Sequence, residues 1–129
     1  MTERSLNLDV YKEALLSKAA ECRNDLEGAR KEISIETTAE AMEHGSRAAE
    51  RELAVERMET FYRLLLQVES ALSRIERGTF GICLKCEDEV GQKRLDALPW
   101  AVLCLQCQEA AELVRESAGA RRYDVRRAA

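Results

Sequence analysis

Two Cys-x-x-Cys pairs constrain the fold of this chain more than any other feature. Cys83 and Cys86 form the first pair, and Cys104 and Cys107 form the second after a loop of seventeen residues. Each pair can present two thiolates to one point, and four thiolates satisfy the tetrahedral preference of Zn²⁺. Because protein ligands then fill all four positions, we predict one structural zinc ion with no open catalytic position. Two disulfides or four unrelated thiols are the alternatives, which the spacing and the lack of a secretory signal disfavour.

The composition favours long solvated helices over a thick globular core. Of the 129 residues, 34% are charged and only 5% are aromatic, with a single proline. The net charge of −4 argues against non-specific binding of nucleic acid, since such proteins are usually basic. No apolar run reaches membrane-spanning length and no signal peptide is recognisable, so we expect a cytoplasmic protein without membrane contact.

Two apolar seams with heptad spacing precede the cysteines. The seam residues, in steps of four and three, are Leu15, Ala19, Cys22, Leu26, Ala29 and Ile33, followed by Ala54, Met58, Phe61, Leu65, Val68, Leu72 and Ile75. This periodicity predicts two helices that pack along one stripe, and the second should begin near Gly45 or Ser46 and end at Gly78. We therefore predict a mainly α fold, in which a long antiparallel coiled-coil hairpin precedes a small C4 zinc-finger module and a short C-terminal helix.

The connection between the seams is acidic. No Lys or Arg occurs from Glu32 to Ser46, so the far end of the hairpin, near 36–46, should be an acidic tip. Arg47 and Arg51 occupy positions where the second seam would continue, which indicates that apolar packing thins out toward this tip. We predict a boundary between a hairpin domain, 1–79, and a zinc domain, 80–129, whose module spans 83–107. A short helix is expected at 108–117, before a basic tail.

At this point the sequence resembles a known family, the DksA/TraR C4-type zinc-finger proteins. The resemblance is carried by the run from Gly78 to Cys83, the two Cys-x-x-Cys pairs, the run from Lys93 to Ala97 with Pro99, and the acidic-tipped hairpin. It implies a monomeric regulator of transcription that binds bacterial RNA polymerase, inserts its coiled coil into the secondary channel and modulates initiation without reading DNA sequence. No enzymatic activity is expected.

The family's tip pattern, Asp-x-x-Asp-x-Ala, aligns with Glu40, Glu43 and Gly45. The resemblance therefore implies that these residues act on the polymerase, with longer acidic side chains and a more flexible backbone than the family pattern. Family members that respond to guanosine tetraphosphate use cationic side chains at positions that align with Gln67, Leu98 and Gln108. Since all three are uncharged here, we expect no strong dependence on that nucleotide.

Two other functions remain open from the residues alone. A zinc-ribbon DNA-binding protein would use Lys85, Lys93, Arg94 and the C-terminal arginines, but the segment 78–108 carries three basic and four acidic side chains. A thiol-based redox sensor would lose its zinc when the four cysteines are oxidised. The fifth cysteine, Cys22, lies on the first seam, where a small buried apolar side chain is expected. His44, the one histidine, falls in the tip and is expected to be an exposed loop residue.

Overall fold

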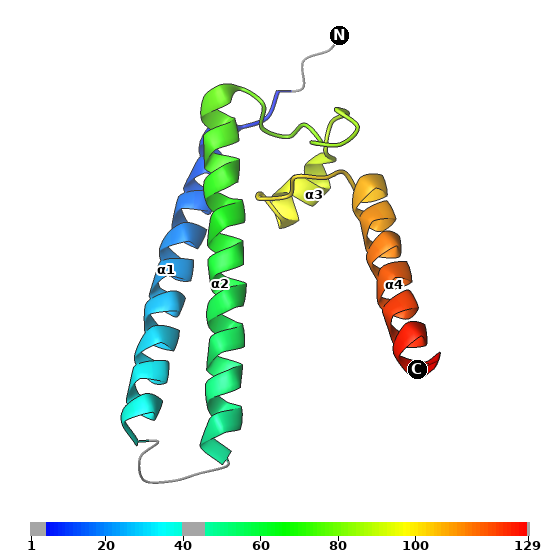
Figure 1. Cartoon of the computed structure of the whole chain (residues 1–129). Helices are drawn as coiled ribbons and strands as arrows, with labels where there is room; N and C mark the ends of the chain where they lie inside the picture. Colours follow the sequence, from blue (N-terminus) through cyan, green and yellow to red (C-terminus); the bar gives the residue numbers. More distant parts are fainter. Residues whose placement is uncertain (1–4, 40–45, 129) are drawn as a thin grey trace. The chain divides into compact units, whose positions relative to one another are not determined.

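The structure is a computed structural model, and it describes residues 5–39 and 46–128. Its four helices are α1 (Leu8–Ala39), α2 (Ser46–Arg77), α3 (Gln92–Ala97) and α4 (Leu105–Ala128) (Figure 1). The described residues contain no strand beyond one isolated antiparallel bridge between Ile82 and Glu89. The fold is thus mainly α, as predicted. The chain divides into two compact units, Met1–Gly78 and Thr79–Ala129, which are described separately below.

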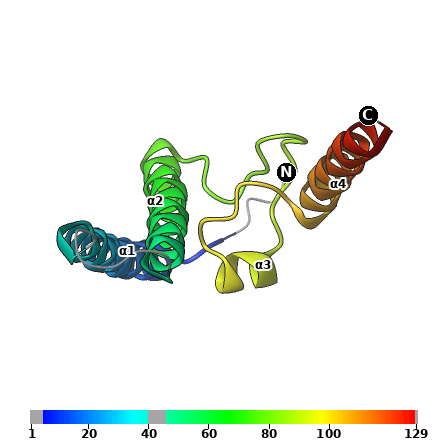
Figure 2. The ribbon, with the colours of Figure 1, turned by 60° about the horizontal axis from the view of Figure 1, so that its bottom comes forward.

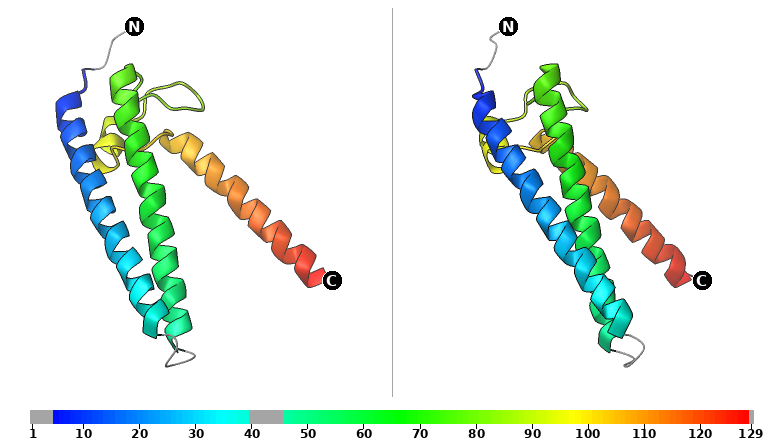
Figure 3. Two further views of the ribbon diagram at one scale, coloured as in Figure 1. Left: turned by 60° about the vertical axis from the view of Figure 1, so that its left-hand side comes forward. Right: turned by 90° about the vertical axis from the view of Figure 1, so that its left-hand side faces the viewer.

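The first unit is a hairpin of two antiparallel helices. Helices α1 and α2 lie side by side along their lengths in every view (Figures 1 and 3). Each has 32 residues and is therefore about 48 Å long. The predicted seams face each other, because the buried residues of this unit include Leu15, Ala19, Cys22, Ala29, Ala54, Leu65 and Val68. Burial of these side chains is what holds two otherwise solvated helices together.

The predicted ends of α2 are confirmed. It begins at Ser46 and ends at Arg77, directly before Gly78. Gly78 has a φ of 78°, and its N–H donates to the carbonyl of Ile75 at 3.3 Å. A residue in this left-handed conformation commonly ends a helix, and glycine adopts it without a steric penalty. Arg74 and Arg77 lie in the last turn, where cationic side chains complement the helix dipole.

Packing varies along the seam of the hairpin. In the N-terminal half of α1, the side chains of Leu15, Ala19 and Cys22 are at most 1% exposed. In the half nearer the α1–α2 connection, the large seam residues Leu26 and Met58 are only half-buried. Among the side chains that the structure describes there, the buried ones are small: Ala29 is 6% exposed and Ala54 is 0% exposed. Leu72 and Ile75, seam residues in the other half, are also half-buried, so the tightest part of the seam lies around Leu15, Cys22 and Val68.

Arg74 is a buried charged residue that the seam pattern did not predict. Its side chain is 6% exposed, and Nη1 donates to Ser70 Oγ at 3.0 Å on the same helix. Its Nη2 atom is buried and has no hydrogen-bond partner among the described residues. Burial lowers the pKa of Arg74, because it disfavours the charged form.

The second unit contains the loops that carry the cysteines, the short helix α3 and the C-terminal helix α4 (Figure 2). The short helix expected at 108–117 is in fact longer: α4 runs from Leu105 to Ala128 and includes the backbone of the predicted basic tail. Alanine and arginine are good helix formers, and the single interruption, Gly119, costs only about 1 kcal/mol relative to alanine. Helix α3 was not predicted, since six residues are too few to show a period.

The predicted tip residues Glu40, Glu43 and Gly45, and the histidine His44, lie outside the described residues. Their predicted roles therefore stay predictions. Among the residues that the structure does describe, no helix has an apolar stretch long enough to cross a membrane.

Candidate metal centre

The first cysteine pair lies on a tight turn in the second unit. Val90 N–H donates to the Gly81 carbonyl at 2.8 Å, and Cys83 N–H donates to the Asp88 carbonyl at 2.8 Å. Gly81 is buried with a φ of 82°, a conformation that suits glycine and turns the chain into the first knuckle. The knuckle closes where Glu87 N–H donates to the Cys83 carbonyl at 3.1 Å. These bonds direct both thiols of the pair to one side.

The second pair lies at the start of α4. Cys104 directly precedes the helix and its carbonyl accepts the N–H of Gln108 at 2.9 Å, while Cys107 is in the first turn. A helix N-terminus carries partial positive charge, which stabilises thiolates. The two knuckles are joined by a backbone bond in which Leu84 N–H donates to the Val102 carbonyl at 2.9 Å. That bond brings cysteines from distant parts of the sequence together.

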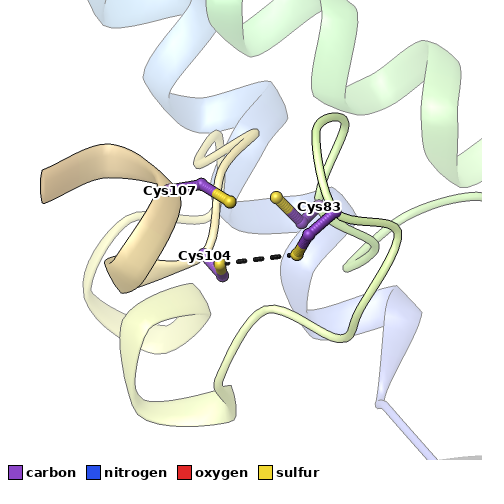
Figure 4. A group of neighbouring side chains, drawn as sticks. Cys83, Cys104 and Cys107 are labelled. Carbon is purple, nitrogen blue, oxygen red and sulfur yellow. Dashed lines mark hydrogen bonds between the residues drawn. The ribbon is translucent and has the colours of Figure 1, made fainter. Parts of the chain in front are cut away.

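The four sulfur atoms converge on one point. The Sγ atoms of Cys83, Cys86, Cys104 and Cys107 all lie within 4.8 Å of one another. Figure 4 shows the labelled side chains of Cys83, Cys104 and Cys107 turned toward each other. The Sγ atoms of Cys86 and Cys104 lie 3.7 Å apart. The predicted ligand set is therefore brought together by the fold.

The geometry fits a tetrahedral zinc ion and does not fit a disulfide. Zn–S bonds of about 2.3 Å place neighbouring sulfurs about 3.8 Å apart in a regular tetrahedron. The separation of 3.7 Å between Cys86 and Cys104 is close to that edge, whereas a disulfide requires about 2.05 Å. All five cysteines are free thiols, and Cys22 is buried on the hairpin seam, as expected. The arrangement of the four sulfurs thus supports a metal site over two disulfides.

The close approach of the four sulfur atoms shifts the pKa values of the cysteine thiols. Burial raises the pKa of Cys83, but hydrogen bonds from the backbone of Cys86, Cys104 and Lys85 outweigh it and lower the pKa to about 6. The pKa of Cys107 is raised to about 12, mainly by its side-chain hydrogen bond with Cys104 and then by burial. Neighbouring sulfurs share protons because several thiolates cannot ionise side by side without a cation. A divalent cation at the centre is what allows all four to be thiolates.

The surroundings of the centre show how little apolar packing supports it. Over residues 79–119, where burial is described, the buried apolar residues are Phe80, Cys83, Val90, Leu95 and Pro99. Leu95 belongs to α3, and its neighbour Arg94 donates from Nε to the Leu103 carbonyl at 3.1 Å. Sequence reasoning missed this bond, which ties α3 to the segment just before the second knuckle. Trp100, which follows Pro99, is half-buried.

The three positions that align with the family's nucleotide-binding cations are also placed by the structure. Gln67 is exposed on α2 in the first unit. Leu98 is 38% exposed directly after α3, and Gln108 is half-buried in the first turn of α4. Gln108 donates from Nε2 to Glu112 Oε1 at 3.1 Å. None of the three supplies a positive charge that could hold a phosphate.

The segment that carries the four cysteines is similar in sequence to known proteins. Residues 78–113 match the family described as the prokaryotic dksA/traR C4-type zinc finger. An uncharacterized protein of Aquifex aeolicus is 45% identical over 53 residues, which cover 41% of this chain and 35% of that protein. The RNA polymerase-binding transcription factor DksA of Escherichia coli K12 is 39% identical over 51 residues, covering 40% of this chain and 34% of the factor. The matches thus span about a third of the length of these relatives.

Solved structures extend the similarity to the hairpin. Transcription factor DksA2 from Pseudomonas aeruginosa has a TM-score of 0.70 at 26% identity, with 84% of each chain covered. The DnaK suppressor protein from Agrobacterium tumefaciens has a TM-score of 0.58 at 26% identity, covering 84% of this chain and 97% of that one. The similarity in fold therefore reaches well beyond the segment that is similar in sequence. The chain is thus similar to the DksA/TraR C4-type zinc-finger family in sequence over residues 78–113, and to proteins named DksA2 and DnaK suppressor in fold over most of its length.

Proposed function

We propose that this protein is a transcription regulator that binds bacterial RNA polymerase and inserts its hairpin into the secondary channel to modulate initiation. The observation that carries the proposal is the match to transcription factor DksA2 over 84% of both chains, which includes the hairpin as well as the zinc finger. The Escherichia coli relative is an RNA polymerase-binding transcription factor, which supports the choice of partner. The function involves no catalysis by this chain.

The hairpin has the shape that such a role requires. A pair of helices about 48 Å long buries little surface and reaches far from its base. The connection between the helices carries Glu40 and Glu43, whose charges can act on a basic loop or on a metal ion in a partner. We propose that these two carboxylates, with Gly45, form the part that acts on the polymerase.

In this proposal the zinc ion is structural. Bound zinc crosslinks the two knuckles through Cys83, Cys86, Cys104 and Cys107 and stabilises a module with few buried apolar side chains. Hydrogen bonds within the module position the ligands. The backbone bonds around Gly81 and Leu84 orient the thiols, and the side chain of Arg94 connects α3 to the segment before the second knuckle. The zinc ion and these bonds together keep the module folded.

The double substitution Glu40→Ala with Glu43→Ala tests the role of the tip. We expect the double variant to bind core RNA polymerase with near wild-type affinity but to lose its effect on the lifetime of promoter complexes. A matched control is Glu50→Ala with Glu52→Ala, which removes two exposed carboxylates from the α2 surface. Normal regulation by the tip variant would contradict the proposed mechanism, whereas failure of the wild-type chain to bind polymerase would contradict the function itself.

A further inference from the structure

The C-terminal helix α4 carries apolar side chains that no described residue of the second unit covers. Burial is described for the part of α4 from 105 to 119, and there only Cys107, Gln108 and Ala111 are half-buried. From 112 to 119 every side chain is exposed, and this stretch spans about two helical turns. Leu113 and Val114 are 64% and 68% exposed. This part of α4 therefore has no packed face.

A helix without a packed face is expected to gain stability from a partner. In proteins most helical stability comes from packing of an apolar face, because helix propensity alone contributes little. Helix α4 has 24 residues, and Gly119 in its interior weakens it by about 1 kcal/mol relative to alanine. Leu113, Val114, Ser117 and Ala118 line an open hollow on this helix. Neighbouring apolar side chains left in water are typical of a surface that a partner covers.

The charges of α4 are divided between its two halves. The first half, up to position 116, is acidic: it carries Glu109, Glu112 and Glu116, and the single cation Arg115. The second half is basic: it carries Arg121, Arg122, Arg126 and Arg127, and the single anion Asp124. Opposite halves make α4 complementary to a second α4 that runs in the opposite direction, whereas a parallel copy would place like charges together.

Small residues lie at the middle of α4. The helix runs from Leu105 to Ala128, so its midpoint falls directly before the run Ser117-Ala118-Gly119. In a two-fold symmetric pair of antiparallel helices, residues near the midpoint meet their own counterparts. Small side chains there let two helices approach to about 8 Å. No neighbouring atom lies within 4 Å of a Cβ added at Gly119, so the space beside this position is open.

We propose that α4 pairs antiparallel with α4 of a second copy of this chain. Leu113 and Val114 of each copy pack against the partner helix, and the acidic half of each helix lies along the basic half of the other. The proposal does not rest on the function proposed above, and it differs from the monomer that the family resemblance implies. An interface of one helix from each copy falls at the low end of interface sizes, below about 1,200 Å², so we expect a dissociation constant of about 10 μM.

Sedimentation equilibrium of the full zinc-loaded chain tests the association. Between about 1 and 200 μM, the 14.6 kDa monomer should convert to a dimer, and high salt should weaken the dimer because its charges are exposed. Val114→Ser should raise the dissociation constant at least about tenfold. Leu16→Ser is the matched control, because Leu16 is also an exposed leucine, on α1 of the other unit, and its loss should leave the constant unchanged.

An exchange of charges tests the antiparallel direction. Glu109→Arg with Glu112→Arg makes both halves of α4 basic, and Arg126→Glu with Arg127→Glu makes both halves acidic on balance. Each double variant alone should stay monomeric because its helices repel each other, whereas an equimolar mixture of the two should form a heterodimer. Glu50→Arg with Glu52→Arg makes the same change of net charge on the exposed surface of α2 and should self-associate like the wild type. Circular dichroism and zinc content confirm folding of each variant.

Four outcomes would overturn the proposal. The first is a wild-type chain that stays monomeric over the whole concentration range. The second is a dimer that Val114→Ser and the charge variants leave intact, because another surface then forms it. The third is a mixture of the two charge variants that stays monomeric. The fourth is a monomeric wild type whose affinity for core polymerase falls on Val114→Ser, since the polymerase is then what covers α4.

Discussion

Removal of zinc should unfold the segment 79–104 and leave the hairpin of α1 and α2 folded. The three largest buried apolar side chains of the module, Phe80, Val90 and Leu95, contribute about 1.5–3 kcal/mol each. Together they supply less than the roughly 10–16 kcal/mol that zinc provides in isolated zinc-finger peptides. The hairpin has its own buried seam, which includes Leu15 and Val68, and it contains no zinc ligand. Its stability should therefore not depend on the metal.

The assay is stepwise chelation followed by circular dichroism and hydrogen exchange. Helices α1 and α2 hold 32 residues each, against 6 in α3 and 24 in α4, so chelation can remove at most about a third of the helical signal. Exchange protection should disappear at the amides of Cys83, Val90 and Leu95, whose hydrogen bonds belong to the module, and persist at Val68. Re-addition of zinc should restore the signal.

Two results would refute this reasoning. If chelation melts the hairpin together with the module, the two units fold cooperatively and the seam alone is insufficient. If the amides of Cys83 and Val90 stay protected without metal, the backbone bonds and the small apolar cluster suffice, and zinc is not the main source of stability. Cys83→Ser is an independent check, because it removes one ligand while every other residue remains; it should behave like the chelated wild type.

Two further predictions concern the hairpin and use neighbouring or matched residues. Leu15→Ala should lower the free energy of unfolding by about 2–5 kcal/mol because Leu15 is fully buried, whereas Leu16→Ala, at a residue that is 51% exposed, should change it by less than about 0.5 kcal/mol; urea unfolding followed at 222 nm compares them. Gly28→Ala should stabilise α1 by up to about 1 kcal/mol, since no neighbouring atom lies within 4 Å of the added methyl group. Gly78→Ala should instead destabilise by about 1–2 kcal/mol, because its φ of 78° strains a side chain. Equal effects of Leu15→Ala and Leu16→Ala would contradict the argument from burial. Equal effects of Gly28→Ala and Gly78→Ala would contradict the argument from backbone conformation.

Much of the fold followed from local patterns in the sequence. The heptad spacing predicted which faces of α1 and α2 pack, and Leu15, Cys22 and Val68 are buried as predicted. Gly78 predicted the end of α2, since few other residues adopt its conformation. The spacing of the four cysteines predicted the metal site. These features depend on residues close in sequence or on a fixed period, so the tertiary structure was not needed to find them.

Other features of the fold could not be predicted from local patterns in the sequence. Helix α3 and the bond from Arg94 to the Leu103 carbonyl were missed, because a six-residue helix has no readable period and the bond joins segments nine residues apart. The length of α4 was underestimated, since one glycine costs too little to end a helix of alanine and arginine.

What the sequence alone determined was the two long helices of the hairpin and the four metal ligands. What only the tertiary structure decided was exposure. Leu26 and Met58 occupy seam positions equivalent by spacing to buried Leu15 and Val68, yet they line an open groove with Tyr62. A heptad pattern states which side chains face the partner helix, but the volume of the residues between the two helices decides whether those side chains are enclosed.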